Sequence, residues 1–159
     1  ILFGYVTGAS PIIGYHYGAQ NHDELKNLFK KSMVIMALGG FALAGLIVLS
    51  ADILSGIFVG YDAVLFEMTK RAVLISAFAF LICGINIFGS GFFTALNNGL
   101  ISAVISFLRT VVFQVAAVMI LPIFWEIDGI WWSMVVSELL SFMVTMFFLA
   151  KYKNRYHYI

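Results

Sequence analysis

The stretch that decides the fold is GASPIIGYHYGAQNHDELKNLFKK, which spans Gly8 to Lys31. It begins as an apolar helical segment, becomes polar at Gln20 to Glu24, and continues as a basic amphipathic segment into the next apolar run. Pro11 removes a backbone donor, while Gly14 and Gly18 leave the backbone free to bend or to be approached closely. In a bilayer such residues survive only where protein or water satisfies the loosened backbone. The stretch therefore predicts one helix that ends, and another that begins, at a membrane surface.

The composition around this stretch indicates an integral membrane protein. The chain is 62% hydrophobic and 11% charged, with a mean hydropathy of +1.01, whereas soluble domains are about 45 to 50% apolar and about 25% charged. A formal charge of +1, with the basic residues in short clusters at helix ends, argues against a nucleic-acid-binding surface. The sequence contains no phosphate-binding glycine loop, no nucleophile elbow and no metal-ligand spacing. We therefore expect neither an enzyme nor a metal site.

Four apolar runs predict membrane-spanning helices, at residues 32–51, 72–97, 100–124 and 130–150. About 20 residues suffice to cross a hydrocarbon core of about 30 Å. With the end of a further membrane helix at residues 1–17, they predict an all-α, polytopic membrane helix bundle. We expect a loop at residues 18–31, a polar connection at 52–71 and a tail at 151–159. Because the chain starts inside a helix-like segment, we expect it to be the C-terminal part of a longer protein.

Basic residues predict the orientation. They precede the first complete span and follow the fourth, and four spans place both positions on one side of the membrane: Lys26, Lys30, Lys31, Lys151, Lys153 and Arg155. By the positive-inside rule that side, with the loop and the tail, is cytoplasmic. Aromatic residues at the helix ends are typical of interfacial belts, with one group at each interface: Trp125, Trp131 and Trp132, and Tyr152, Tyr156 and Tyr158.

Small and polar residues recur at helical spacing and predict which faces pack together. One small face, Ala37, Gly40 and Ala44, predicts a close helix contact. The next two seams lie on consecutive helices, and we expect them to face each other: Ser102, Ser106, Thr110 and Gln114 on one, and Ser133, Ser137, Ser141 and Thr145 on the other.

Two opposite charges fall inside predicted spans. Arg109 lies about ten residues from one end of its helix and Glu138 about nine from the opposite end of the next, which places both about 14 to 15 Å deep. We expect them to face one another or a shared polar cavity, because an ionisable group left in lipid is costly. Either they form a structural ion pair, or Glu138 takes part in proton or cation coupling.

The run 72–97 carries three further candidates for a transport pathway, on one helix face: Cys83, Asn86 and Ser90. Asn86 is either a helix-to-helix hydrogen bond or part of a cavity lining, and Ser90 is either packing or a substrate contact. Cys83, the single cysteine, is either a small core residue or a reactive thiol.

The opening stretch resembles a loop signature of the multidrug and toxic compound extrusion (MATE) transporters, carried by Pro11, Gly14, Tyr15, Tyr17, Gly18, Ala19 and Asn21. Later segments are similar to the same family: GFFTALNN at Gly91 to Asn98, Ser106 with Arg109, the pair Leu121 and Pro122, and GIW at Gly129 to Trp131. The resemblance implies the end of the eighth helix and helices nine to twelve, in the second of two six-helix lobes, with the N-terminal lobe as partner.

The same resemblance implies a multidrug efflux antiporter in a bacterial plasma (cell inner) membrane. It would export organic, often cationic, small molecules by alternating access, with sodium ions or protons as coupling ions and no other cofactor. Some members carry an acidic residue on the tenth helix, where this sequence has Asn86 and no core carboxylate. Two alternatives remain, a lipid-linked oligosaccharide or polysaccharide flippase of the same superfamily and a tetraspan membrane scaffold protein.

Overall fold

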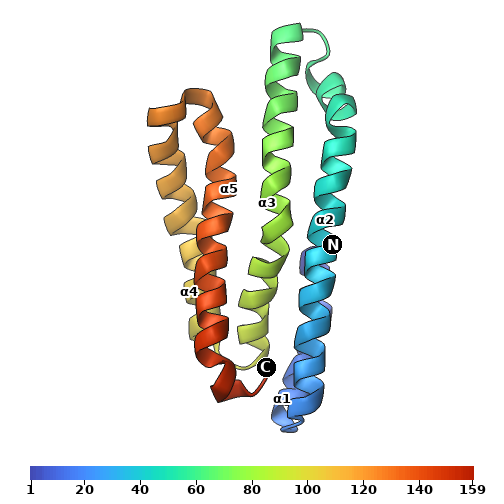
Figure 1. The fold of residues 1–159 in the computed structure, drawn as a ribbon, viewed down its shortest axis with the longest axis vertical. Coiled ribbons are helices and arrows are strands. Elements are labelled where there is room, and N and C mark those ends of the chain that lie inside the picture. Colours follow the sequence, from blue (N-terminus) through green and yellow to red (C-terminus); the bar gives the residue numbers. More distant parts are fainter.

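The computed structural model describes residues 1–159 as an all-α bundle with no strand. The elements are, in chain order, α1 (Leu2–Gly18), α2 (His22–Val59), α3 (Ala63–Ala95), α4 (Gly99–Phe107), the π-helical segment η1 (Leu108–Phe113) and α5 (Gln114–Tyr156). Helix α5 reverses direction at Trp125 and Glu126, which have non-helical backbone angles. Residues 114–124 therefore continue the ascent of α4 and η1, and residues 127–156 descend beside it (Figure 1). The predicted all-α bundle is confirmed.

Each chain reversal is built from local turn chemistry. A residue in the left-handed region ends each of the helical runs that stop at Gln20, Asn97, Glu126 and His157, as is common at helix C-termini. Capping side chains start the helices that follow. Asn21 accepts from Glu24 N at 3.2 Å, and Asp62 accepts from Val64 N at 2.8 Å. These polar residues therefore position the turns between otherwise apolar helices.

The observed helix bounds correct several expectations. Helix α1, which continues through Pro11 to Gly18, agrees with the helix end expected at residues 1–17, whereas the two connections that follow differ. Residues 18–31 are not a loop, because the Asn21 cap starts α2 at His22 and the lysines lie on its first turns. Residues 52–71 are not a connection either, since the reversal is confined to residues 60–62. With 38 residues, α2 is about 57 Å long and exceeds the hydrocarbon core.

The small face of α2 makes the predicted close contact. Gly40 packs directly on α3, where an added Cβ would lie 2.7 Å from the Phe80 carbonyl oxygen. Ala44 on the same face is buried. Close approach through small residues is a usual way for membrane helices to associate. The α2–α3 hairpin, whose two helices run side by side in Figure 1, is held in this way.

The prediction that the two hydroxyl seams face each other is largely wrong. One hydrogen bond joins them, from Ser137 Oγ to Gln114 Oε1 at 2.5 Å. Otherwise, individual members of both seams contact α3. The seam of α4 bonds to Ser90, and Thr145 of the α5 seam packs against Gly89. The central helix α3 therefore contacts both neighbours through small and polar residues, by hydrogen bonds to the α4 seam and by close packing on the α5 seam, where the Thr145 hydroxyl has no hydrogen-bond partner.

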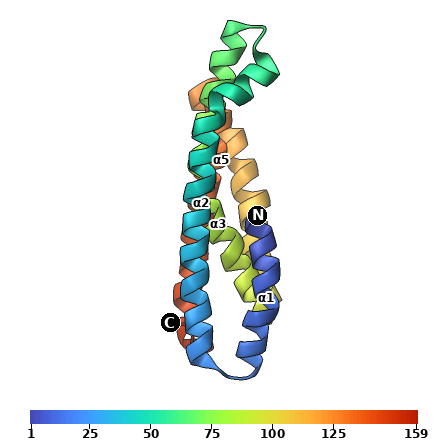
Figure 2. The same ribbon diagram turned by 90° about the vertical axis from the view of Figure 1, so that its right-hand side faces the viewer.

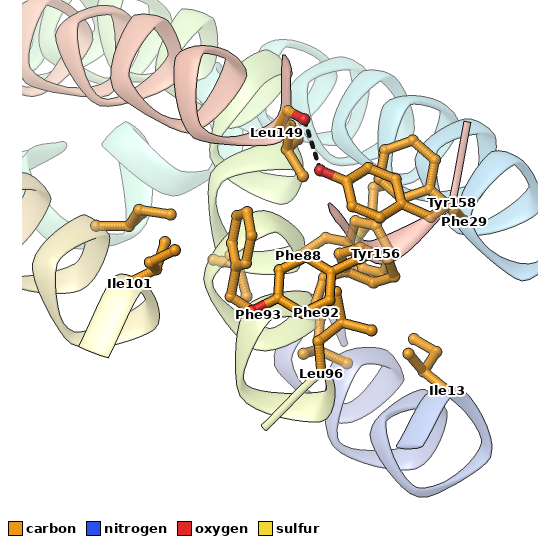
Figure 3. Packing of buried hydrophobic residues seen from close by; sticks show 14 of the residues in the cluster. Ile13, Phe29, Phe88, Phe92, Phe93, Leu96, Ile101, Leu149, Tyr156 and Tyr158 are labelled. Atoms are coloured by element: carbon orange, nitrogen blue, oxygen red, sulfur yellow. Dashed lines mark hydrogen bonds between the residues drawn. The ribbon is translucent and has the colours of Figure 1, made fainter. Parts of the chain in front are cut away.

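The C-terminal residues are part of the core. His157 adopts φ 54° and ψ 40°, and this turn returns Tyr158 to an aromatic cluster, where it is fully buried. Its ring lies 4.9 Å from those of Phe29 and Phe92, and its hydroxyl donates to Leu149 O (Figure 3). The expectation of a tail, with Tyr156 and Tyr158 in an interfacial belt, is therefore wrong. The belt pattern cannot distinguish a ring in lipid headgroups from one folded back into the bundle.

The outer surface is that of a membrane protein. Large apolar side chains are exposed along the bundle, such as Leu38 at 65% and Phe41 at 63%, and α2, α3 and the α4 to α5 run are long and apolar enough to cross a membrane. The first turns of α2 and the C-terminus lie at the same end of the bundle (Figures 1 and 2). The predicted placement of the two basic groups at one end is confirmed.

Candidate functional site

The candidate site is centred on Glu138, which lies on the descending part of α5 and is 7% exposed. Arg109 donates to Glu138 Oε1 through Nε at 2.9 Å and through Nη2 at 2.7 Å. The sequence prediction that these two charges meet is confirmed. A hydrogen-bonded pair is the usual solution for charges inside an apolar bundle, since either group alone would be costly there.

Asn86 of α3 completes the network. Its amide Nδ2 donates to Glu138 Oε2 at 2.7 Å and to the Glu138 main-chain oxygen at 3.0 Å. The side chain is fully buried, and its Oδ1 has no hydrogen-bond partner. Residues from α3, η1 and α5 thus meet at the Glu138 carboxylate, and the network retains one buried acceptor without a partner, Asn86 Oδ1.

Arg109 is presented by an unusual segment. It lies in the six-residue π-helical run η1, which interrupts the regular helix between α4 and α5. Such runs are rare and often occur at functional sites. The wider turn changes the direction in which the following side chains leave the helix, and here the guanidinium reaches the adjacent antiparallel helix.

The network lies at the wall of a cavity of about 290 Å³. Arg109, Glu138 and Cys83 contribute polar atoms, and the rest of the lining is apolar and comes from α1, α2, α3 and α5. A mostly apolar space with a few convergent polar groups is typical of small-molecule sites. The arrangement could accommodate an amphipathic molecule and present a carboxylate and a guanidinium to its polar part.

The five predicted pathway residues do not all meet. Asn86, Arg109 and Glu138 form the network, and Cys83 lines the same cavity. Ser90 does not, because its hydroxyl lies 2.9 Å from Ser102 Oγ and 2.7 Å from Ser106 Oγ. These bonds join α3 to α4.

Sequence reasoning missed two aromatic residues of the cavity, Phe3 and Phe80. Phe80 precedes Cys83 by three residues, so helical spacing already placed it close to the polar face. Phe3 had no such signal, because α1 reaches the cavity through its tertiary packing on α2 and α3.

Apart from Arg109, the motif residues lie outside the site, and four of them have clear structural roles. Gly14 faces the end of α3, where an added Cβ would lie 3.3 Å from the Ala95 carbonyl oxygen. Asn21 caps α2, and Asn98 donates to Tyr156 Oη at 2.7 Å. Gly129 packs on the backbone of Leu121 and Pro122, where an added Cβ would meet main-chain atoms at 2.5 Å. These motifs therefore build the reversals of the bundle.

Comparison with known proteins agrees with this architecture. The model of the MatE family matches residues 1–120. No curated protein and no solved structure matches the chain significantly. The matched region covers about three quarters of the sequence and includes α1 to α4, η1, Asn86 and Arg109. The chain belongs to the MatE family of membrane transporters.

Proposed function

We propose that the chain forms part of the second lobe of a secondary active multidrug efflux antiporter. In this proposal it acts with an N-terminal lobe in a bacterial plasma membrane. It exports organic, often cationic, small molecules in exchange for sodium ions or protons by alternating access. Membership of the family supports transport in general, and the site supports coupling to a cation.

The observation that carries the proposal is the Glu138 carboxylate at the cavity wall. An ionisable group inside a membrane bundle is a functional-site candidate by default. Both of its oxygens are engaged, one by Arg109 and the other by Asn86. Binding of a proton or another cation to this carboxylate weakens its hold on Arg109, which links η1 to α5. Occupancy of the site would thereby alter the packing of the two helices.

The position of Asn86 supports the same assignment. Related transporters that carry an acid on the equivalent of α3 have a cation site there, and this chain has an amide instead. Glu138 Oε2 lies 2.7 Å from Asn86 Nδ2, so the adjacent helix brings a carboxylate to that place. The unpartnered Asn86 Oδ1 adds a neutral oxygen beside it, and oxygen ligands suit a hard cation.

Efflux of a fluorescent organic cation from cells that express the complete transporter tests the proposal. Collapsing the sodium and the proton gradients separately identifies the coupling ion. Glu138→Gln should lose coupled efflux when the rate is normalised to the amount of folded transporter in the membrane, while Glu67→Gln, at an exposed acid on α3, should keep it. Wild-type efflux by Glu138→Gln would reject the coupling role.

One observation favours a flippase of the same superfamily as the second candidate. Arg109 lines the mostly apolar cavity and uses Nε and Nη2 on Glu138, which leaves its Nη1 without a hydrogen bond to the protein. A free guanidinium donor suits a phosphate headgroup. Translocation of a lipid-linked oligosaccharide in proteoliposomes, without cation efflux, would favour this candidate. The scaffold alternative receives no support from family membership.

A further inference from the structure

A second hollow lies at the opposite end of the bundle from the C-terminus, where α5 reverses direction (Figure 1). Its volume is about 530 Å³, and it is lined by Phe124, Trp125, Glu126, Asp128 and Trp132. It shares no residue with the cavity at Glu138. Three of its five lining residues are aromatic and the other two are acidic.

Two of the three aromatic side chains that line this hollow are largely exposed, so their ring faces are accessible to a ligand. The ring centroids of Trp125 and Trp132 lie 6.5 Å apart, with an interplanar angle of 65°. Trp132 also stacks on Phe78 of α3, at 6.3 Å and 17°, which fixes its orientation. Phe124 and Trp125 are 75% and 54% exposed. The faces of tryptophan and phenylalanine attract cations, and tryptophan does so most strongly.

The charge of the hollow is unbalanced. Asp128 pairs with Arg71 of α3 at 2.5 Å, and this pair is locally neutral. Glu126 forms no ion pair, because the three salt bridges of the chain involve other acids. It follows Trp125 directly at the reversal. One uncompensated carboxylate therefore lies among three aromatic side chains.

We propose that this hollow is a binding site for organic cations of the substituted-ammonium class. Such ions carry a diffuse charge and weak hydration, and they gain from both the aromatic faces and the Glu126 carboxylate. A sodium ion prefers several oxygen ligands, and the hollow offers it only one free carboxylate. This site does not depend on the coupling role of Glu138, because the two lie at different places on α5.

Fluorine NMR of the complete transporter labelled with 5-fluorotryptophan tests the proposal, because it reports on single residues. The Trp125 resonance is assigned as the one that Trp125→Leu removes, and it is followed during titration with tetrabutylammonium. We expect it to shift and saturate. Glu126→Gln should raise the midpoint about five- to tenfold through loss of the charge attraction. Trp132→Leu should raise it about three- to tenfold.

Two matched controls separate a site from a diffuse effect. Glu67→Gln removes a negative charge from an exposed position on α3, and Trp131→Leu removes an indole that does not line the hollow. Both should leave the midpoint within twofold. If tetrabutylammonium leaves the Trp125 resonance unshifted, the tryptophans are interfacial anchors only. If Glu67→Gln and Glu126→Gln change the midpoint equally, the cation is attracted by the overall surface charge and not by this hollow. Either result overturns the proposal. If the wild-type transporter showed this shift but no efflux of organic cations, the result would count against the proposed function alone.

Discussion

The contribution of the Arg109–Glu138 pair to stability can be tested with a double-mutant cycle. Arg109→Met removes two hydrogen bonds, of 2.9 and 2.7 Å, from a carboxylate that is 7% exposed. Breaking a buried pair costs about 3 to 5 kcal/mol, because one charge is left uncompensated. The Arg109 side chain is 23% exposed, so we expect the lower end, about 3 kcal/mol. Glu138→Gln should cost a similar amount, since it leaves the guanidinium unpaired.

The double variant Arg109→Met/Glu138→Gln should be much less destabilised than the sum of the single variants. It contains no buried charge, and the glutamine oxygen can still accept from Asn86. We expect it within about 1 to 2 kcal/mol of the wild type, which makes the pair strongly coupled. The measurement is the loss of helical circular dichroism of the purified transporter during titration with sodium dodecyl sulfate.

A second ion pair serves as the control. Lys70 and Asp52 lie 2.5 Å apart, but their side chains are 33% and 66% exposed. Lys70→Met should therefore change the unfolding free energy much less than Arg109→Met does, because solvent screens an exposed pair. An Arg109→Met variant as stable as Lys70→Met would refute the reasoning, because it would mean that solvent screens the Arg109–Glu138 pair. Additive effects in the double variant would refute the coupling.

Three further predictions concern the fold, and each is measured by the same unfolding titration. Gly40→Ala should lower the unfolding free energy by about 1 to 3 kcal/mol, because the new Cβ would lie 2.7 Å from an α3 carbonyl oxygen. The control, Gly45→Ala, adds a Cβ that meets no atom within 4 Å, so it should leave the unfolding free energy unchanged or raise it slightly. Asp62→Ala should cost about 1 kcal/mol through loss of the α3 cap, and Asp62→Asn should restore most of it. Burial, assisted by the neighbouring Tyr156, raises the pKa of Tyr158 above its usual value. As the pH rises, Tyr158 ionises in the unfolded state before it does so in the folded state. The contribution of this side chain to the unfolding free energy is therefore complete below about pH 10 and is lost as the pH rises above that value. Tyr158→Phe should remove this alkaline loss, and coinciding pH profiles of the two proteins would contradict the assignment.

Much of the site could be predicted from the sequence, for a simple geometric reason. Arg109 and Glu138 lie at similar distances from opposite ends of consecutive helices, and short connections make such helices antiparallel neighbours. Their cost in lipid then requires them to meet. Asn86 was a candidate from its helix face, but its partner was not predictable, because nothing in the spacing says which neighbour that face contacts. Ser90 lies on the same face and bonds to a different helix.

The helix ends were the least predictable part of the fold. Apolar composition marks only the lipid-exposed portion, and α2 and α3 continue beyond it because Asn21 and Asp62 cap them at polar positions. The reversal of Tyr158 into the aromatic core also had no local signal. It depends on a left-handed backbone at His157 and on a space between Phe29 and Phe92.

The sequence by itself determined that this chain is a bundle of apolar helices, where its basic residues gather, and that one arginine and one glutamate must be reconciled inside the bundle. Composition and periodicity suffice for these conclusions, because an unpaired charge or an unsatisfied backbone group costs several kcal/mol anywhere in the hydrocarbon core of a bilayer. Only the tertiary structure decided that α3 contacts both hydroxyl seams, that Asn86 completes the network at Glu138, and that the C-terminal residues pack into the core. These features depend on which helix faces pack together. Helical periodicity identifies the residues that share a face, but it does not identify the helix that packs against that face.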